Sequence, residues 1–505
     1  MPAPAIRLNP EDTVAIALED LEAGQVLAEW GVTLVDEVKR GHKIALRDVA
    51  PGEKVLRYGQ IIGQATQPIE RGGHIHSHNL GMGPHELDYA IAQGNRPLPV
   101  ISDGRTFDGY HRADGKVGTR NYLGILTTVN CSGTVARLVA EAAEHDPVIA
   151  SFANVDGVVP IVHGTGCGMA GDGEGFDTLM RTIAGYARHP NFGGIMLLGL
   201  GCEVMQVQTL VGKGRMRADN NFRFMTIQQE GGTRRTIDAS LRELRDMAEI
   251  ANRTTRQPAP LSHIVVGMQC GGSDGYSGIT ANPALGAASD LLVQHGGTTI
   301  LSETPEIYGA EHLLTRRAAT PAIAHAMIDR ISWWEDYCTR NGGEMDNNPS
   351  PGNKRGGLTT ILEKSLGAVA KSGTAPMVGF YKFAEPITTP GFVYMDSPGY
   401  DPASVTGQIA SGANLIAFTT GRGSVSGYKP TPCLKLATNS EMYGRMADDM
   451  DINCGDIISA GVSIPAKGRE IFEAFIAAAS GKKTKSEELG FGGVEFVPWQ
   501  IGAVM

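Results

Sequence analysis

The segment that decides the fold class is "NYLGILTTVNCSGTVARLVAEAAEH", residues 121–145. Its first nine residues are largely apolar and have the length of one buried strand, and residues 133–145 have the apolar periodicity of an amphipathic helix. The same order returns in "GVVPIVHG" (157–164) and "FDTLMRTIAGYARH" (176–189). Alternating strands and helices predict a mainly parallel sheet covered by helices. We therefore expect an α/β domain over residues 110–256.

A second series of strands and helices follows this one. "HIVVGMQCGG" (263–272) and "TTILSE" (298–303) are typical of buried strands, and "PALGAASDLLVQHGG" (283–297) of a helix. The polar, proline-containing stretch 252–262 separates the two series. The sequence thus predicts a second α/β domain over residues 257–505, again with a mainly parallel sheet.

The amino-terminal region has a different pattern. Between residues 14 and 78, short apolar runs alternate with turn sequences such as "APGEK" (50–54) and "ERGG" (70–73), which predicts a small β domain over residues 1–80. Residues 81–109 have scattered Gly and Pro and weak periodicity, as a linker does. The expected fold class is α/β, with a small β domain ahead of two α/β domains.

Composition excludes several classes of function. The chain has 505 residues, 42% of them hydrophobic and 19% charged, and no apolar run approaches the roughly 18 residues of a membrane span. We expect a cytoplasmic protein, because the first residues lack a secretory signal pattern. A net charge of −10 argues against binding to nucleic acid or to an anionic membrane. A small anionic substrate is compatible with this net charge, since a local basic pocket can exist on an acidic protein.

Three histidines occupy alternate positions in "GGHIHSHNLGMG", residues 72–83. If this run is an extended strand, His74, His76 and His78 point to one side, where neutral imidazoles bind a transition metal or contact a substrate. The alternative is a solvated strand end whose histidines only make hydrogen bonds. The remaining motifs have to decide between the two.

Four of the seven cysteines follow strand candidates directly: Cys131, Cys167, Cys202 and Cys270. In open α/β sheets ligands bind beyond the carboxyl ends of the strands, where these thiols are expected. Thiolates there bind a soft metal or an iron–sulfur cluster. Alternatively, each cysteine packs as a small hydrophobic residue. The chain has no close Cys-x-x-Cys pair, and an odd number of cysteines in a reducing compartment argues against disulfides.

Polar groups gather on glycine-rich loops in the second α/β domain. "QCGGSDGYSGITANPALG" (269–286) places Ser273, Asp274 and Asn282 ahead of a helix, where they can hold a carboxylate or phosphate. "GTGCGMAGDGEG" (164–175) matches the dinucleotide fingerprint only loosely, so a nicotinamide cofactor is not expected.

Basic and acidic side chains accompany these loops. Lys354, Lys364, Arg422 and Lys435 lie in or beside loops and strand ends, which suits a polyhydroxylated acid, although a lysine is most often solvated at the surface. In "SETPEIYGAEHLL" (302–314), two glutamates, Glu303 and Glu306, can take a proton or bind a hard cation, whereas Glu311 is expected to face solvent.

Together these stretches resemble the altronate dehydratase and galactarate dehydratase family. The likeness covers almost the whole chain, and its most specific parts are "GYHRADGKVGTRN" (109–121), "GLGCE" (199–203), the 269–283 segment, "NPSPGNKRGGLTTILEKSLG" (348–367) and "FTTGRG" (418–423). The resemblance implies an amino-terminal SAF domain of the β-clip type. It also implies a divalent metal, Fe²⁺ or alternatively Mn²⁺, with an iron–sulfur cluster left open.

The resemblance further implies a hydro-lyase that removes the proton next to a carboxylate and expels the neighbouring hydroxyl. In this hypothesis the base is Lys364 or His163, and His78 approaches the leaving hydroxyl. Ser273, Asp274, Asn282, Lys354, Arg422 and Lys435 bind the sugar acid, and His74, His76, Cys167, Cys202 and Cys270 are candidate metal ligands. The runner-up activity is (2R)-sulfolactate sulfo-lyase, and the competing class is a non-catalytic sugar-acid binder. We expect a homodimer.

Overall fold

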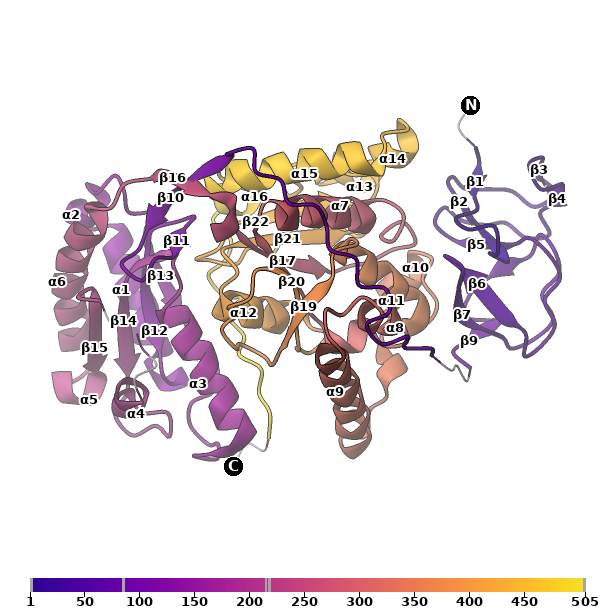
Figure 1. Cartoon of the computed structure of the whole chain (residues 1–505). Helices are drawn as coiled ribbons and strands as arrows, with labels where there is room; N and C mark the ends of the chain where they lie inside the picture. The colour runs from indigo at the N-terminus through magenta and orange to yellow at the C-terminus, as the bar shows by residue number, and fades with distance from the viewer. Residues whose placement is uncertain (1–2, 84–86, 214–215, 217–218, 503–505) are drawn as a thin grey trace.

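The computed structural model describes residues 3–83, 87–213, 216 and 219–502, and the chain forms three parts in a row (Figure 1). The amino-terminal β domain lies at one end and the first α/β domain at the other. The second α/β domain lies between them, so spatial order differs from chain order. The segment that joins the β domain to the first α/β domain therefore has to cross the second.

The β domain consists of short antiparallel strands, as the turn-separated apolar runs predict. One sheet has the order β1-β2-β5-β8, another the order β6-β7-β9, and β3 pairs with β4. The strands are β1 (Ala5–Ile6), β2 (Val14–Ala17), β3 (Val26–Leu27), β4 (Val32–Thr33), β5 (Lys43–Ala45), β6 (Lys54–Arg57), β7 (Gln60–Ala65), β8 (His74–Ile75) and β9 (Leu80–Gly81).

Residues 72–83 do not form one extended strand, which was the condition for the three histidines to point to one side. Strand β8 ends at Ile75 and a turn follows, because the side chain of Asn79 accepts from the His76 amide (2.9 Å) and donates to the His74 carbonyl (2.9 Å). The three rings nevertheless gather on one side, since the centroid of the His74 ring lies 5.6 Å from that of His76 and 5.5 Å from that of His78.

The expected linker lies along the second α/β domain. The Ala92 amide donates to the Thr315 carbonyl (3.0 Å) and the Ile101 amide to the Gln294 carbonyl (2.8 Å). Its last residues, 106–109, already belong to β10 (Thr106–His111), which pairs with β11 (Val117–Gly118) and β16 (Gln257–Pro260) in a small antiparallel sheet between the two α/β domains.

The first α/β domain contains the parallel sheet β13-β12-β14-β15. Helices α1 and α6 pack on one face and α3 on the other, where Leu179, Met180 and Ile183 form the buried stripe that the periodicity predicts. The elements are β12 (Tyr122–Thr127), α1 (Gly133–Glu144), α2 (Pro147–Ala150), β13 (Val158–Ile161), α3 (Gly173–Ala187), β14 (Phe192–Gly199), α4 (Val207–Gly212), β15 (Phe222–Thr226), α5 (Ile227–Glu230) and α6 (Thr233–Asn252).

The second α/β domain contains a seven-stranded parallel sheet of order β19-β20-β18-β17-β21-β22-β23. Its strands are β17 (Val265–Cys270), β18 (Thr298–Leu301), β19 (Met377–Tyr381), β20 (Gly391–Met395), β21 (Leu415–Thr420), β22 (Cys433–Ala437) and β23 (Ile452–Asn453). Two parallel sheets behind a β domain confirm the predicted fold class.

Helices cover both faces of this larger sheet. Helices α7 and α15 pack against each other on one face, and α12 lies on the other. The helices are α7 (Ala281–Gln294), α8 (His312–Thr315), α9 (Pro321–Arg340), α10 (Pro351–Arg355), α11 (Ile361–Val369), α12 (Asp401–Ser411), α13 (Ser440–Arg445), α14 (Asp456–Ser459), α15 (Ile464–Ala479) and α16 (Lys485–Glu488).

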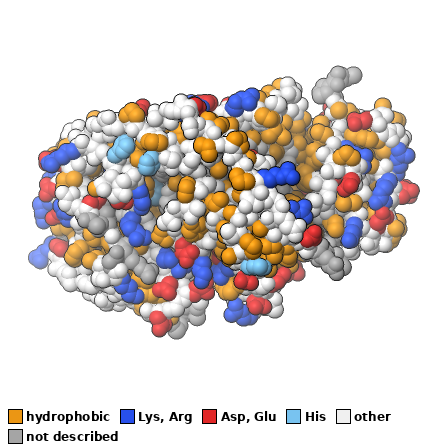
Figure 2. Space-filling view, in the orientation of Figure 1, with side chains coloured by type: hydrophobic (Ala, Val, Ile, Leu, Met, Phe, Trp, Pro, Cys, Tyr) orange, Lys and Arg blue, Asp and Glu red, His pale blue; other side chains and the backbone are white. Residues whose placement is uncertain are grey.

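The two α/β domains contact each other through α3 and α12. The approach is close, because a Cβ atom placed on Gly185 of α3 would lie 2.2 Å from the Ala410 carbonyl oxygen of α12. Figure 2 shows acidic and basic side chains interspersed over the visible face, without a continuous basic surface there. No helix within the described ranges has both the length and the apolarity that crossing a bilayer requires.

Candidate active site

The candidate site lies where the β domain covers the carboxyl end of the larger parallel sheet, near α10 and α11 (Figure 1). Backbones of the two domains approach closely there. A Cβ on Gly275 would lie 2.1 Å from the Gly41 carbonyl oxygen, and the Gly275 amide donates to the Gly356 carbonyl (2.7 Å). Glycine at 275 is therefore required by the contact between the domains.

A buried ion network holds the β domain in place. The Glu363 carboxylate of α11 accepts from Lys43 Nζ (2.9 Å) and Arg57 Nη1 (2.5 Å), and these three side chains are at most 1% exposed. Burial acts to raise the pKa of Glu363, but the charges of Lys43 and Arg57 lower that pKa to about 2. The network joins strands β5 and β6 to the second α/β domain.

The β domain presents four histidines to this interface, one more than the sequence indicated. His42 joins the run because β5 and β8 are antiparallel, with Ile44 opposite His74. The His42 ring centroid lies 5.1 Å from that of His74 and 5.0 Å from that of His76.

The hydrogen bonds of these rings fix which nitrogen of each ring donates and which accepts. His42 Nε2 donates to the Arg355 carbonyl (3.3 Å), so its Nδ1, 3.0 Å from His74 Nε2, has the lone pair in the neutral ring. His76 Nε2 likewise donates to the Lys354 carbonyl (2.9 Å). His76 Nδ1 then accepts from Ser77 Oγ (3.0 Å), and His42 Nδ1 accepts from His74 Nε2. A metal-binding histidine also donates its second ring N–H to a carbonyl, so these rings share one feature of such ligands.

Burial lowers the pKa of His42, His74 and His76, which favours their neutral form. It lowers the pKa of His74 to about 3, with help from the neighbouring rings, and that of His76 to about 4. Neutral imidazoles suit Fe²⁺ and similar ions. Within the described ranges, however, no three His, Cys, Asp or Glu side chains converge as a finished metal site. The donor chemistry fits a divalent ion, but the rings have to turn to bind one.

A polar pocket of about 110 Å³ lies next to the histidines. Four arginines line it, Arg40, Arg355, Arg422 and Arg445, together with Asp274 and Asn439. Arg40 pairs with Glu441 (2.5 Å), so the remaining arginines make the pocket locally cationic.

Asp274 forms the floor of this pocket. Its carboxylate accepts from Thr438 Oγ1 (3.0 Å), Asn439 Nδ2 (3.2 Å) and Ser277 Oγ (3.1 Å). Burial raises the pKa of Asp274 despite these bonds. The many partners indicate that Asp274 organises the loops around the pocket.

Three carboxyl groups and a lysine are buried beside β17 and β18. Glu303 is 1% exposed in the left-handed region (φ 72°), and one carboxylate oxygen of Glu303 and one of Glu306 have no hydrogen-bond partner among the described residues. Burial and the nearby carboxylates raise the pKa of Glu303 well above its usual value, and they raise that of Asp401 to about 6. Strained, unpartnered carboxyl groups of this kind are typical of catalytic sites.

Lys364 is paired with one of these carboxylates. Its Nζ lies 2.5 Å from Glu306 Oε1 and 3.0 Å from Asn348 Oδ1. Burial opposes the charge on Lys364, but Glu306 outweighs it and raises the pKa. A protonated lysine is not a ready base, so the expectation that Lys364 abstracts the substrate proton is not supported by its environment.

Other sequence candidates support the site rather than line it. Ser273 Oγ contacts Cys270 Sγ (2.8 Å), and Asn282 accepts from Thr419 Oγ1 (2.6 Å) and donates to the Gly367 carbonyl (2.9 Å). These contacts order the loop after β17. Lys435 is fully buried within β22, where Nζ donates to the Ser426 carbonyl (3.1 Å), so it stands apart from the pocket.

Three candidates lie in the other α/β domain. Cys167 and Cys202 are exposed on loops of the first sheet, at the opposite end of the molecule from the β domain (Figure 1). His163 is buried there, where Nε2 donates to the Thr127 carbonyl (3.0 Å) and Nδ1 accepts from the Thr165 amide (3.3 Å). The structure therefore does not bring these residues to the histidines of the same chain, because α/β domains with separate sheets have separate strand ends.

The expectation that Glu311 faces solvent is wrong. Its side chain is buried at the start of α8 and accepts from Tyr89 Oη (3.3 Å) of the linker. Burial raises the pKa of Glu311 to about 7. The linker covers this glutamate, which the local sequence alone does not reveal.

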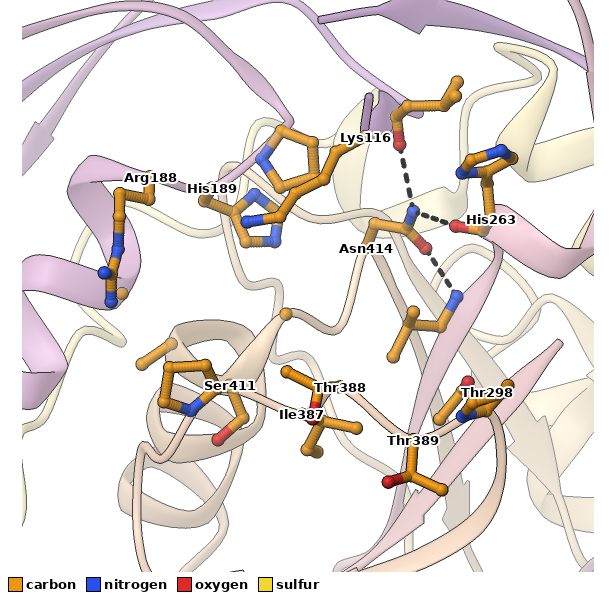
Figure 3. Close-up of a pocket in the computed structure, with 18 of the residues that line it drawn as sticks. Lys116, Arg188, His189, His263, Thr298, Ile387, Thr388, Thr389, Ser411 and Asn414 are labelled. Atoms are coloured by element: carbon orange, nitrogen blue, oxygen red, sulfur yellow. Dashed lines mark hydrogen bonds between the residues drawn. The ribbon is translucent and has the colours of Figure 1, made fainter. Parts of the chain in front are cut away.

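A second cavity, of about 340 Å³, lies between the two α/β domains (Figure 3). It adjoins the amino ends of β17 and β18, away from the site above, and the described residues that line it include no carboxylate. His189 in its wall donates to the Ala413 carbonyl (2.9 Å) and accepts from the Asn191 amide (3.2 Å). Because this cavity lies at the amino ends of the strands and its described lining lacks a carboxylate, it is not the candidate active site.

The geometry defines an acid–base site of an α/β enzyme, and comparison with known proteins gives its family. Residues 3–83 match the altronate/galactarate dehydratase SAF domain, residues 109–252 the D-galactarate dehydratase/altronate hydrolase second domain, and residues 261–504 the D-galactarate/altronate dehydratase C-terminal domain.

Whole-chain relatives agree. The chain is 35% identical to altronate dehydratase of Bacillus subtilis, covering 96% of this chain and 97% of the relative, and 38% identical to galactarate dehydratase (L-threo-forming) of Escherichia coli, covering 96% and 94%. The chain belongs to the galactarate/altronate dehydratase family, whose named members are hydro-lyases, and the recognition from sequence is confirmed.

Two further relatives are subunits of one enzyme. The chain is 32% identical to the beta subunit of (2R)-sulfolactate sulfo-lyase of Chromohalobacter salexigens over 77% of this chain and 96% of the relative. It is 42% identical to the alpha subunit over 81 residues, 86% of that relative. In that enzyme, the sequence that resembles this chain is divided between two polypeptides.

Proposed function

We propose that this protein dehydrates a sugar acid, an aldonate or aldarate such as altronate or galactarate, to a 2-keto-3-deoxy acid. The observation that carries the proposal is the pair Glu303 and Glu306, at the strand ends near an arginine-lined pocket. Each has one buried carboxylate oxygen without a hydrogen-bond partner in the part of the chain that the structure describes. Membership of the dehydratase family supports the same reaction.

The arginine pocket supplies recognition of the acid. Arg355 and Arg422 present guanidinium groups suited to bidentate binding of a carboxylate, and the amide of Asn439 suits a hydroxyl. Lys354 lies on α10 beside Arg355, and we propose that it adds positive charge at the entrance. In this assignment Asp274 keeps the loops in position.

The proton steps are assigned to the two glutamates. Glu306, held by Lys364, takes the proton next to the substrate carboxylate, and the C–H electron pair forms a carbon–carbon double bond. The neighbouring C–O bond breaks as Glu303, kept protonated by burial, gives its proton to the departing hydroxyl. Water leaves, and the enol rearranges to the keto acid.

Substrate has to reach side chains that are nearly inaccessible to solvent. Asn348, which is half-buried, bonds both Glu306 (2.7 Å) and Lys364 (3.0 Å). We propose that the segment 341–350 carrying it moves to admit the sugar acid and then closes, since exclusion of water strengthens the electrostatic interactions inside.

We also propose that the reaction depends on a divalent metal, Fe²⁺ or Mn²⁺. His42, His74 and His76 would hold it, and His78 lies beside His74. A divalent ion bound there would polarise the substrate's carboxylate and hydroxyl oxygens. The dimer expected from the sequence stays a prediction.

The test is a substrate panel. The protein is incubated anaerobically with aldonates and aldarates plus Fe²⁺, and 2-keto-3-deoxy acids and water loss are followed by mass spectrometry. We expect at least one sugar acid to be converted. Release of sulfite from (2R)-sulfolactate instead would establish the runner-up activity that the two-subunit relatives favour. Saturable binding of a sugar acid without conversion, with metal present, would make the protein a binder.

A further inference from the structure

The exposed cysteines of this chain all lie at the carboxyl end of one sheet. Cys131, Cys167 and Cys202 are exposed, whereas the other four cysteines are buried or half-buried. The three follow the neighbouring strands β12, β13 and β14 of the first α/β domain, with β12 in the middle. Apolar packing does not account for thiols in this position, because cysteine is usually buried when it only packs.

Hydrogen bonds hold the three cysteine loops together. The Asn130 amide donates to the Thr165 carbonyl (3.0 Å), which joins the first loop to the second. The Val204 and Met205 amides both donate to the Gly166 carbonyl (3.1 Å each), which joins the third loop to the second. Each bond lies within three residues of a cysteine, so the thiols share one rim.

Glycines make this close arrangement possible. Gly166 (φ 99°) precedes Cys167, and a Cβ on it would lie 2.1 Å from the Thr128 carbonyl oxygen at the end of β12. Gly201 (φ 127°) precedes Cys202. The second and third loops thus turn sharply at the strand ends and leave their thiols at the surface.

One of the three cysteines also lies close to the amino end of a helix. Cys131 lies just before the twelve-residue helix α1, whose cap residue Ser132 makes no side-chain capping bond. The amino end of a helix stabilises negative charge, including a thiolate.

A single ion does not match this arrangement. No three His, Cys, Asp or Glu side chains in the described part of the chain meet closely enough to hold one ion. An iron–sulfur cluster spans several metal atoms and takes cysteines that are further apart. We propose that Cys131, Cys167 and Cys202 bind one [4Fe–4S] cluster and leave its fourth iron open to a non-protein ligand. The three thiols lose their protons and form three iron–sulfur bonds.

This cluster site is independent of the proposed dehydration. It lies in the first α/β domain, whereas the glutamates, arginines and histidines proposed for catalysis belong to the other two. Failure of either assignment therefore leaves the other standing.

The test is anaerobic reconstitution of the full chain with Fe²⁺ and sulfide, followed by removal of free iron. Iron and acid-labile sulfide are counted, and visible absorption and electron paramagnetic resonance are recorded. We expect about four irons and four sulfides per chain. Acid-labile sulfide separates this cluster from an ion on the histidines, which adds iron alone.

Three single variants, Cys131→Ser, Cys167→Ser and Cys202→Ser, locate the cluster. Each should lose most of the sulfide and the visible absorption, while Cys338→Ser, a half-buried cysteine elsewhere, keeps both. Circular dichroism checks that each variant is folded. A wild-type chain without labile sulfide, a cluster of two irons, or variants that all retain the full cluster would each overturn the proposal.

Discussion

The two α/β domains use the same architecture and present opposite chemistry at their strand ends. In the first, the loops after β12, β13 and β14 carry exposed thiols. In the second, the ends of β17 and β18 lie beside Lys364, Glu303 and Glu306, all at most 7% exposed. The difference comes from the β domain, α10 and α11, which cover the second domain in this region.

A covering layer changes the chemistry that a strand end can support. Burial raises the pKa of Glu303 well above its usual value, which favours its protonated form, and it lowers the pKa of His42, His74 and His76, which favours neutral imidazoles. An open rim instead leaves soft ligands accessible for a cofactor. The elements that cover the strand ends, more than the sheet itself, therefore determine which chemistry is available there.

The largest effect is expected when the carboxyl group of Glu303, at the buried strand ends of the second domain, can no longer donate a proton. Glu303→Gln should lower kcat by about 10²–10⁴-fold, because a positioned acid contributes about that much. Steady-state assay of keto-acid formation measures it. Glu311→Gln, another buried glutamate, is the matched control and should keep kcat. Equal kcat in the two variants would contradict the assignment of Glu303 as the acid.

The next prediction concerns the attachment of the cover. Glu363→Gln should reduce the free energy of unfolding by about 3–5 kcal/mol, because it leaves Lys43 and Arg57 buried without their anion. Denaturant unfolding measures the loss. The exposed pair Arg105–Glu473 gives the control: Glu473→Gln should cost at most about 1 kcal/mol. If the two variants differ little, the network does not hold the β domain.

A smaller effect is expected in metal binding by the cover. His42→Ala should weaken Mn²⁺ binding by about 10–100-fold, since this ring faces His74 and is oriented by the Arg355 carbonyl. Calorimetric titration of the metal-free protein measures the affinity. His145→Ala, an exposed histidine on the first domain, serves as the control. Unchanged affinity in His42→Ala would remove His42 from the site.

The smallest effect is expected for His163, which is buried inside the first α/β domain and makes its stability depend on pH. Burial lowers the pKa of His163 to about 4 from an ordinary 6.5, so between these values the unfolded chain binds a proton that the folded chain does not. Stability from this group is complete above pH 6.5 and falls on acidification by about 1.4 kcal/mol per pH unit. In His163→Gln the fall in unfolding free energy between pH 7 and 5.5 should be smaller. An identical pH profile would contradict this, and kcat should be unaffected.

Much of this structure was predictable from the local hydrophobic pattern of the sequence. The rest depends on how strands that are distant in the sequence pair with one another. Residues 121–145 and 263–297 read directly as strand and helix because their periodicity reports burial. His42 was missed because it enters the site only through the β5–β8 register. Asp401 and Glu306 lie 95 positions apart, and only the order of parallel strands brings such residues together. Cys167 and Cys202 were grouped with the histidines as metal ligands because the sequence does not show which of the two parallel sheets the β domain covers.

The Lys43–Arg57–Glu363 network implies that this enzyme is modular in assembly. Its amino-terminal domain is held by ion pairs and close backbone contacts, so the peptide running through residues 87–105 serves as a tether. A chain severed within that tether should stay together as a two-piece complex, like the relatives whose corresponding portions are made as distinct subunits. Gene fission and fusion in such a lineage would then require no new interface.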